Sequence, residues 1–524
     1  MRDILVSLNF DAWALPALLI IPLVGALVTR FFANENVSET AAFEWRGPHS
    51  ITLHTFVLMG LVGIGILIMF EPGEAGWQLV ADYAWIPDWG ARFTLAVDGI
   101  SLFMVLLTIL VIPLSIVGSL TQVRERARSY YALLLGWTAG IIGVFLAVDL
   151  LLFYVFWELM LIPMYFIIGI WGGERRVYAS LKYFVFTFLG SLMMLVGVLF
   201  VWISAGASSF HYDHLLASAS LSPTTQLWMF GAFFIAFAVK SPLFPLHTWL
   251  PDAQHEAPTT AAVALGIKVA TYGVIRLAVP FFPAAALQPT IHTVILVLSV
   301  VSIVYGALVA MVQPDFKRLV SYSSISHLGF VMLGIFALTV QSVDGAMIVM
   351  LSSGLTSTML FLLVGMLHER RRTGMIHNFG GLARIAPMGS AFLVLAAMGS
   401  IGLPGTSGFV GEFLVLLGSY QTQPIFAVVA ATGIILAAVY FLWALQRMLF
   451  DPVPASEKAG PRMKDMNRRE LSVMLILAIA VLWIGIAPGP ILRRIEPSAQ
   501  LMVDRVLEDA AASEAAESIT APGR

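Results

Sequence analysis

The sequence of 524 residues contains no cysteine, and only 11% of its residues are charged. The missing thiols exclude disulfides, cysteine-ligated iron–sulfur clusters and cysteine-based zinc sites within this chain. Soluble domains usually carry about 25% charged residues, so the low charge and the 59% of hydrophobic residues together indicate a polytopic membrane protein. The net charge of −2 argues against a nucleic-acid partner.

Motifs of soluble enzymes are also missing, since the sequence has no Walker A motif, no GxGxxG after a strand and no nucleophile elbow. The N-terminal stretch MRDILVSLNFDAWALPALLIIPLVGAL has no clear cleavage site of small residues and runs directly into a full-length apolar span. We therefore expect a retained first helix and no cleaved signal peptide.

Windows of about 20 apolar residues predict an all-α polytopic membrane protein with about 14 transmembrane helices. The predicted spans lie near 12–32, 50–70, 97–119, 130–148, 150–171, 179–203, 225–246, 258–279, 290–312, 319–338, 344–367, 388–416, 424–446 and 471–489. The 388–416 stretch is longer than one membrane crossing needs, so a break is expected within it.

Basic residues concentrate in alternate loops, and these loops are expected on the cytoplasmic side, with both termini outside. They are Arg30 and Arg46; Arg124, Arg126 and Arg128; Arg175 and Arg176; Lys317 and Arg318; Arg370, Arg371, Arg372 and Arg384; and Arg447, Lys458, Arg462, Lys464, Arg468 and Arg469. Loop 247–257 departs from the pattern because it carries acids and no base, and so do Arg493, Arg494 and Arg505 after the last span.

Two segments outside the spans have patterns of their own. The stretch 77–96 alternates aromatic and β-branched residues around Pro87 and Gly90, which predicts an external hairpin. The tail after about residue 497 is rich in Ala, Ser and Glu and predicts a surface helix that frays toward the C-terminus.

Two spans are interrupted by proline, at Pro242 and Pro245 directly after Lys240, and at Pro404 shortly before Glu412. In a membrane, broken helices occur where protein or water satisfies the freed backbone groups, and paired breaks indicate a transport site. The order of helices predicts two inverted units of five, 130–279 and 290–449, each with a broken fourth helix. Residues 1–129 would form helices 1–3 with the hairpin, and 450–524 a cytoplasmic linker, the last span and the tail.

Four charged side chains lie inside apolar stretches: Glu158 in FYVFWELMLIPMYF, Lys182 in ASLKYFVF, Lys240 in FAVKSPLFP and Lys268 in LGIKVATYG. One charge at the centre of a bilayer costs about 2.5–3.5 kcal/mol on insertion scales. Four such charges in one chain therefore indicate a path for protons or ions.

Glu158 and Lys240 occupy the second and fourth helices of the first unit, where packing would bring them close enough to pair. A lysine keeps its charge beside a carboxylate and tends to lose it when that charge moves away, so the pair would be a two-state proton switch. A static buried ion pair is the alternative. Lys268, one helix further on, would relay protons to Lys240, as would Lys182, for which snorkelling to the cytoplasmic edge is the alternative.

His327 and Glu412 carry the pattern into the second unit. His327, in SYSSISHLGF, takes the position that Glu158 has in the first unit, and it could pass a proton onward, with a hydrogen-bonded structural histidine as the alternative. Glu412, in the apolar surroundings GFVGEFLVLL, follows the second break and would end the path.

The loop HTWLPDAQHE contains His247, Asp252, His255 and Glu256. The spacings of five and three do not place ligands on one helix face, so the loop is a weak metal site and no metal is expected. Capping a half-helix and shaping a cytoplasmic entry is the preferred reading, with His247 and His255 as possible path residues. Asp98 and Asp149 lie at membrane edges, where helix capping is a sufficient explanation.

Taken together, these residues resemble the antiporter-like membrane subunits of respiratory complex I. The motifs that carry the resemblance are FWELMLIPMY, KSPLFPLHTWLPDAQHEAPT, GIKVATYG, DFKRLVSYSSISHLGF and LPGTSGFVGEF, which together cover about 130–450. Glu412 is similar to the chain M (chain 4) type, because two of the paralogues would have Lys there.

The resemblance implies a proton-translocating module with no redox centre or cofactor of its own. NADH, FMN, iron–sulfur clusters and quinone would lie in partner subunits, and the partners would include two paralogous antiporter-like chains and lipid. Glu158, Lys240, Lys268, His327 and Glu412 match positions of the family's proton path. The composition suggests a bacterial source, hence the cytoplasmic (inner) membrane.

Two relatives of this architecture stay open as alternatives. One is a subunit of a multisubunit cation/proton antiporter without a redox link, and the other is the membrane arm of a membrane-bound hydrogenase. A purely structural spacer is a third reading, which unimpaired proton pumping after neutral substitutions at Glu158 and Lys240 would favour.

Overall fold

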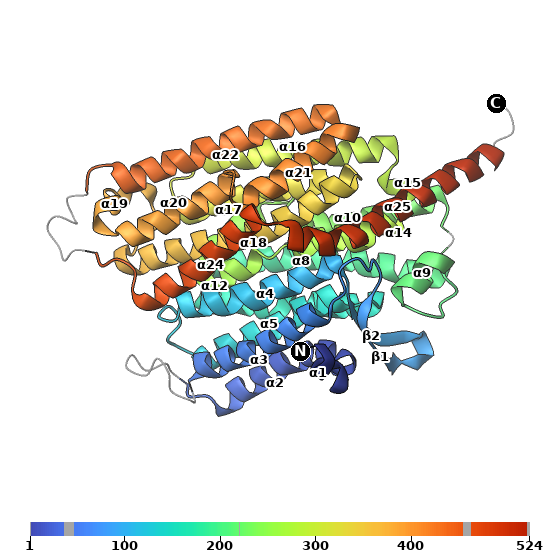
Figure 1. Ribbon diagram of the computed structural model, residues 1–524, viewed down its shortest axis with the longest axis horizontal. Helices are drawn as coiled ribbons and strands as arrows, with labels where there is room; N and C mark the ends of the chain where they lie inside the picture. Colours follow the sequence, from blue (N-terminus) through green and yellow to red (C-terminus); the bar gives the residue numbers. More distant parts are fainter. Residues whose placement is uncertain (1, 36–46, 220, 454–462, 521–524) are drawn as a thin grey trace.

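The computed structural model describes residues 2–35, 47–219, 221–453 and 463–511, and the backbone of 512–520. The basic residues Arg46, Lys458 and Arg462, which contribute to the predicted charge pattern, lie outside these ranges. Long helices run side by side along the longest axis of the molecule, with α19 at one end and the β1–β2 hairpin at the other (Figure 1).

The N-terminal part contains three long helices and the hairpin. Its elements are α1 (Arg2–Ser7), α2 (Phe10–Phe32), α3 (Pro48–Met69), β1 (Gln78–Ile86), a 3₁₀ turn (Pro87–Trp89), β2 (Ala91–Val97) and α4 (Gly99–Gly118). The two strands pair antiparallel, with Tyr83 opposite Phe93, which confirms the predicted hairpin. The pair Arg92–Asp82, 2.7 Å apart, joins the strands.

The next part spans the first predicted unit. It consists of α5 (Ala127–Leu146), α6 (Leu150–Leu159), α7 (Leu161–Trp171), α8 (Arg176–Ser204), α9 (Tyr212–Ser218), α10 (Pro223–Lys240), α11 (Trp249–Glu256), α12 (Thr259–Leu265), α13 (Val269–Gly273), a π-helical turn (Val274–Ala278), α14 (Val279–Phe281) and α15 (Pro283–Ala286). Several of these helices are short because single predicted spans are interrupted.

The remaining part spans the second predicted unit and the C-terminal helices. It consists of α16 (Pro289–Met311), α17 (Phe316–Phe336), α18 (Val340–Arg371), a 3₁₀ turn (Ile376–Asn378), α19 (Leu382–Ile385), α20 (Pro387–Ile401), α21 (Ser407–Thr422), α22 (Pro424–Phe450), α24 (Arg468–Ile486) and α25 (Gly489–Thr520). Among the described residues, twelve helices are long and apolar enough to cross a membrane.

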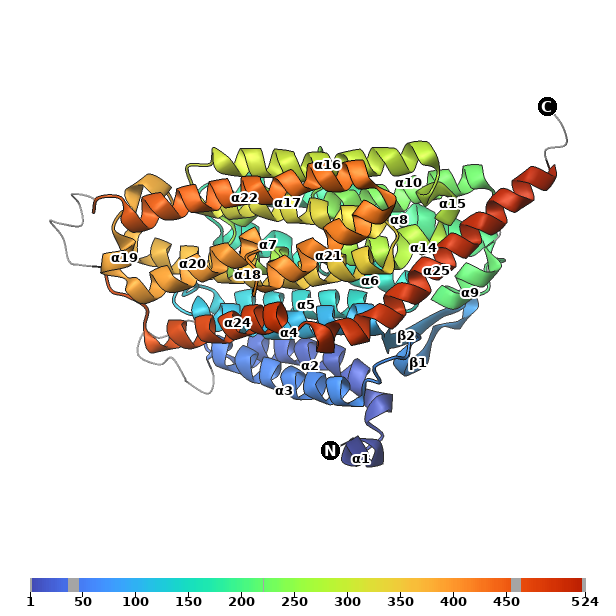
Figure 2. The ribbon, with the colours of Figure 1, turned by 45° about the horizontal axis from the view of Figure 1, so that its top comes forward.

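Each of the predicted spans coincides with one of these helices or with an interrupted pair. Helix α10 and the pair α20–α21 account for the two spans beyond the twelve. The tail prediction placed the surface helix too late, because α25 already begins at Gly489 and crosses the bundle obliquely (Figure 2). Its stripe of buried residues, which includes Ile491, Ile495 and Val506, packs on the bundle and explains the earlier start.

Side-chain caps set several helix starts. The Asp98 carboxylate accepts the backbone N–H of Ser101 at the start of α4, and Asp149 accepts the N–H groups of Leu151 and Leu152 at the start of α6. The capping roles predicted for both residues are therefore confirmed. Helix α18 lies in the centre of the molecule, and its most apolar 18-residue window is completely buried.

Candidate functional site

The fourth helix of each unit is broken, as its prolines predict. Residues 241–248 separate α10 from α11, where Pro242 and Pro245 cannot donate backbone hydrogen bonds. Residues 402–406 separate α20 from α21, around Pro404. A further kink follows Glu158, because α6 ends at Leu159 and Pro163 leaves the carbonyl of Leu159 without an N–H donor.

Lys240 occupies the last turn of α10, directly before the first break. Its Nζ lies 3.5 Å from the hydroxyl of Tyr183, 5.5 Å from the Tyr183 ring centre and 5.4 Å from the Trp157 ring centre. The faces of these two rings attract the ammonium in place of water.

The charge of Glu158, which follows Trp157 in the chain, acts on Lys240, but among the described residues no ion pair within 4.0 Å joins the two side chains. The Oε1 atom of Glu158 is buried and has no hydrogen-bond partner. The direct pairing predicted from the sequence is thus absent in this conformation.

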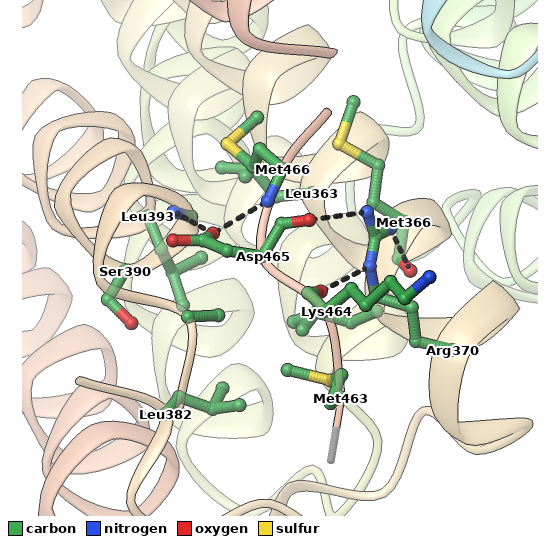
Figure 3. Close-up of a pocket in the computed structure, with 13 residues that line it drawn as sticks. Leu363, Met366, Arg370, Leu382, Ser390, Leu393, Met463, Lys464, Asp465 and Met466 are labelled. Carbon is green, nitrogen blue, oxygen red and sulfur yellow. Dashed lines mark hydrogen bonds between the residues drawn. The ribbon is translucent and has the colours of Figure 1, made fainter. Parts of the chain in front are cut away.

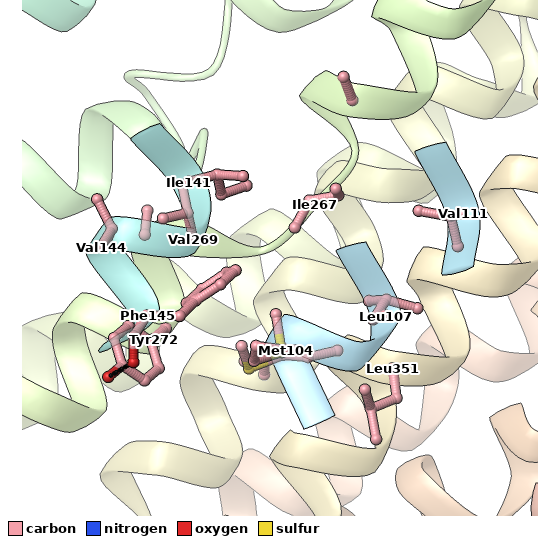
Figure 4. Packing of buried hydrophobic residues seen from close by; sticks show 14 of the residues in the cluster. Met104, Leu107, Val111, Ile141, Val144, Phe145, Ile267, Val269, Tyr272 and Leu351 are labelled. Atoms are coloured by element: carbon pink, nitrogen blue, oxygen red, sulfur yellow. Dashed lines mark hydrogen bonds between the residues drawn. The ribbon is translucent and has the colours of Figure 1, made fainter. Parts of the chain in front are cut away.

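Lys268 lies in a third interruption, which the sequence did not reveal. Helix α12 ends at Leu265, α13 begins at Val269, and Lys268 stands between them with only 5% of its surface exposed. The neighbours Ile267 and Val269 pack in the apolar cluster drawn in Figure 4. Because these neighbours fill the core, the break is fixed by tertiary packing and leaves Lys268 at an irregular turn of the backbone.

A small cavity lies beside both Lys240 and Lys268. Its volume is about 10 Å³, close to the lower limit for a single water molecule. Lys240 and Lys268 both line it, together with Gln254 and with Leu328, the neighbour of His327 on α17. The cavity therefore lies where the break in α10–α11, the break in α12–α13 and the histidine helix of the second unit meet.

His327 and Glu412 come together at the second break. The Nε2 atom of His327 lies 2.9 Å from the Ser400 carbonyl oxygen and 3.8 Å from Oε1 of Glu412. Because a carbonyl oxygen only accepts hydrogen bonds, Nε2 carries a proton in this arrangement. Both side chains are buried, with 7% and 5% of the residue exposed. The structure thus places these two residues of the predicted path next to each other.

Gly402 makes room for Glu412. Its φ of +82° lies in the left-handed region, and an added Cβ would lie 2.6 Å from Oε2 of Glu412. A larger residue would be strained in this conformation and would also push the carboxylate away. Gly402 therefore allows the backbone of the second break to lie close to the Glu412 carboxylate.

Lys182 forms an ion pair at the predicted cytoplasmic side. Its Nζ lies 2.8 Å from Oδ2 of Asp252, and Arg318 contacts Oδ1 of the same carboxylate at 3.3 Å. All three side chains are partly exposed, with 18% for Lys182 and Asp252. Asp252 thus joins α8 and α11 of the first unit to α17 of the second. This rim site was anticipated only as a general cytoplasmic entry.

The two histidines of this loop have different surroundings. His247 is buried against the rings of Phe244 and Tyr305, at 5.7 and 5.0 Å, and its Nδ1 has no hydrogen-bond partner. His255 lies 3.3 Å from Asp315. Within the described residues, no group of three His, Cys, Asp or Glu side chains is placed to hold a metal ion.

Replacing Asp315 with Ala should destabilise the protein by about 1–2 kcal/mol at pH 7, because it removes the cap of α17 together with the His255 contact. Burial raises the pKa of Asp315, but its interactions with His255, the Arg318 N–H and Lys317 outweigh burial and keep the pKa below its ordinary value. A pKa lowered by folding gives stability that is present above about pH 4 and is lost as the pH falls further.

Melting temperatures of the detergent-solubilised protein at pH 7 and pH 3 check this expectation. The difference between wild type and Asp315→Ala should be smaller at pH 3. Asp315→Asn is the matched control, since it keeps the capping oxygen and loses only the charge. A difference of equal size at both pH values would contradict the assignment.

A larger cavity, drawn in Figure 3, lies at the predicted cytoplasmic end of α18 and α20, and its lining does not include Lys240, Lys268 or Glu412. It has a volume of about 30 Å³ and is lined mainly by apolar side chains. Arg370 pairs with Glu470 at 2.6 Å, and the Asp465 carboxylate accepts the N–H groups of Met388 and Gly389 at the start of α20. These contacts hold the segment before α24 against the bundle, so the residues around the cavity have a structural role.

Comparison with known proteins identifies relatives over most of the chain. Residues 147–437 match the family described as "NADH:quinone oxidoreductase/Mrp antiporter, TM". The chain is 42% identical to NADH-quinone oxidoreductase subunit M of Rhodobacter capsulatus, covering 88% of this chain and 92% of the relative. It is 36% identical to NADH-ubiquinone oxidoreductase chain 4 of Marchantia polymorpha, covering 93% and 97%.

Solved structures agree in fold. A chain of the respiratory complex I from Thermus thermophilus with bound NADH superposes with a TM-score of 0.85 at 31% identity, covering 94% of this chain and 99% of that one. A chain of the Mrp complex from Dietzia sp. gives a TM-score of 0.79 at 20% identity, covering 95% and 55%, which supports likeness of fold alone.

Proposed function

The chain belongs to the NADH:quinone oxidoreductase/Mrp antiporter membrane family, and from this membership we propose that it is the proton-translocating membrane-arm subunit of an NADH–quinone oxidoreductase. One observation carries the proposal beyond the family: Lys240 and Lys268, two ionisable side chains among apolar residues, lie at successive breaks and line one cavity. Such groups in lipid are costly and occur where ions or protons move.

The proposed route crosses the molecule from the first unit to the second. Protons enter at the rim where Lys182 and Asp252 pair, and reach Lys240 at the end of α10. They continue through the small cavity to Lys268, which lies in the next break. His327 takes them across to Glu412, with a separation of 3.8 Å in the conformation described. His247 lies in the first break and His255 in α11, and both are proposed to shape the entry.

The driving step is a change in distance between Glu158 and Lys240. At an effective dielectric constant of 20, two unit charges attract by about 4 kcal/mol at 4 Å and by about 2 kcal/mol at 8 Å. A movement of a few ångströms therefore changes the free energy of the charged lysine by about 2 kcal/mol, or more than a tenfold change in an equilibrium constant. The breaks and the kink beside both residues provide backbone that can move without disrupting whole helices.

The electron-transfer chemistry is proposed to lie in other subunits. With no cysteine in the sequence, this chain offers no thiolate ligand for an iron–sulfur cluster. NADH, FMN, the clusters and quinone would therefore be bound by partners, and the neighbours in the membrane arm would include two paralogous antiporter-like chains and lipid. The proposed location is the cytoplasmic membrane of a bacterium, in agreement with the source of the bacterial relatives.

Purification of the tagged chain from its native membrane in mild detergent tests the proposal. Flavin, iron–sulfur signals and an NADH:quinone reductase activity that is sensitive to quinone-site inhibitors should co-purify. Small membrane subunits without flavin or iron would indicate a cation/proton antiporter instead, and a nickel-containing partner would indicate a membrane-bound hydrogenase. Either of the latter results would overturn the assignment to an NADH–quinone oxidoreductase.

A further inference from the structure

Asp344 is an isolated carboxyl group near one end of the central helix α18. It is the only charged residue between Val340 and Leu367. Only 8% of it is exposed, and its Oδ1 atom is buried without a hydrogen-bond partner. A buried carboxyl oxygen without a partner is costly, so a proton or water has to satisfy it during part of the time.

Asp344 lies at the predicted external end of α18. The capping residue of this helix, Thr339, is five positions earlier, which corresponds to about 7 Å along the helix axis. The opposite end of α18 carries the basic cluster His368 to Arg372, which the charge pattern places on the cytoplasmic side. The Asp344 side chain thus lies within about two helical turns of the predicted external end of α18.

The packing of α18 against α21 fixes the height of Asp344 relative to Glu412. A Cβ added at Gly411 would touch the backbone of Val349, and one added at Gly345 would touch that of Val415. The two helices are therefore antiparallel, and Glu412 is level with the residue at position 348. Four residues separate this level from Asp344, which consequently lies about 6 Å closer to the external side than Glu412 does.

Helix α25 brings a surface carboxylate to the same place. It packs on α18, and the negative charge of Glu496, which is exposed on α25, acts on Asp344. The oblique course of α25 over the bundle is visible in Figure 2. Three carboxyl groups thus follow one another in order of depth: Glu412 in the interior, Asp344 one step outward, and Glu496 at the surface.

Other charged groups on the helices around α18 do not neutralise Asp344. Helices α4, α12 and α20 contain no charged residue. On α21 the titratable groups are Glu412 and Tyr420, and on α17 they are Lys317, Arg318, Tyr322 and His327. On α24 they are Arg468, Arg469 and Glu470, at the cytoplasmic start. On α25, Arg494 bonds the Pro490 carbonyl oxygen and Arg493 that of Gly489, and Arg505 lies nine positions beyond Glu496 along the helix.

We propose that Asp344 is the carboxyl group through which protons leave the second unit toward the external side, an inference that rests on the proposed function. The Glu412 carboxyl gives its proton, through intervening water, to the Asp344 carboxylate. Protonated Asp344 then releases that proton to water beside Glu496 and returns to the carboxylate. Both acids end in the form in which they began once Glu412 is reloaded through His327, so the step is balanced without an oxidant or reductant.

The test uses the complete complex reconstituted in liposomes with its proton-release side facing an interior of controlled pH. Asp344→Asn should lower the NADH-driven proton-translocation rate at least about tenfold. Asp344→Glu should translocate protons at a rate within about threefold of wild type. Its dependence on internal pH should differ from that of wild type, because the longer side chain places the carboxyl group at a different depth. Asp504→Asn, at an exposed carboxylate further along α25, is the matched control and should behave as wild type.

Wild-type translocation by Asp344→Asn would overturn this inference. Comparison with Lys240→Met separates it from the proposed function: if Lys240→Met is blocked and Asp344→Asn is not, only the exit assignment fails, whereas normal translocation by both overturns the proposed function as well. If Asp344→Asn does not assemble, Asp344→Glu decides, because an internal-pH profile identical to wild type would contradict a role in release.

Discussion

Replacing Lys240 with Met should abolish quinone reduction that is coupled to proton translocation, with a loss of at least about thirtyfold, or about 2 kcal/mol in the activation barrier. Methionine keeps much of the length of the side chain and fits between Trp157 and Tyr183, but it cannot carry a proton. Oxidation of NADH by an artificial electron acceptor should continue, because that reaction does not require proton movement through this chain. The two rates, measured on the same membranes, check the prediction.

The matched control for this substitution is Arg447→Gln. Arg447 is exposed in the last turn of α22 and stacks on Trp443, 4.3 Å from the ring centre, away from the buried lysines. The Arg447→Gln substitution removes one positive charge from a residue that is not part of the proposed route. Removing one member of a buried charge pair can cost about 3–5 kcal/mol, so assembly of each variant has to be confirmed on native gels. Full coupled activity of an assembled Lys240→Met complex would contradict the assignment.

Replacing Glu412 with Gln should lower coupled quinone reduction at least about tenfold, or about 1.4 kcal/mol. Glutamine has nearly the same shape and can remain beside His327 and Gly402, but its amide does not accept and release a proton. Glu412→Asp retains the carboxyl group, and it should recover part of the activity despite the shorter side chain. Steady-state NADH:quinone reductase assays with and without an uncoupler measure both effects.

The control for Glu412 uses another carboxyl group of similar burial. Glu470 is 2% exposed but pairs with Arg370 at the predicted cytoplasmic end of α18, outside the proposed route. Glu470→Gln should therefore reduce stability without a selective loss of coupling. If Glu412→Gln and Glu470→Gln behaved alike in assembled complexes, Glu412 would be a structural residue only.

Hydropathy and proline positions predicted most of the architecture. Each apolar stretch corresponds to a helix because lipid leaves the backbone no other way to satisfy its polar groups within one segment. Pro242, Pro245 and Pro404 marked the two broken helices because proline removes a donor regardless of its surroundings. Both features are local, and local chemistry can be read from the sequence.

The third break, at Lys268, could not be predicted in this way. The segment 265–273 contains no proline. A glycine such as Gly266 does not mark a break, because glycine is common in intact membrane helices. The interruption results from the way Ile267 and Val269 fit the apolar cluster, which depends on helices distant in the sequence (Figure 4). The conspicuous charge was identified, whereas the backbone irregularity that positions it was not.

The contacts between charges were predicted less well than their identities. Lys182 was expected either to snorkel or to relay protons, and its partner Asp252 is 70 positions away on a half-helix. Glu158 and Lys240 were expected in direct contact, but the aromatic side chains of Trp157 and Tyr183 surround the lysine instead. Asp344 was not singled out from the sequence, where it is the first residue of the predicted span 344–367, because burial of a side chain depends on the packing of helices distant in the sequence.

The most direct test of the account is the acidification of liposomes that contain the assembled complex, driven by NADH and quinone, for wild type, Lys240→Met and Arg447→Gln. Wild type and Arg447→Gln should acidify the liposomes at comparable rates, and Lys240→Met should not acidify them above background. Acidification by the assembled Lys240→Met complex at the wild-type rate would contradict the claim that protons cross this chain on its buried charges.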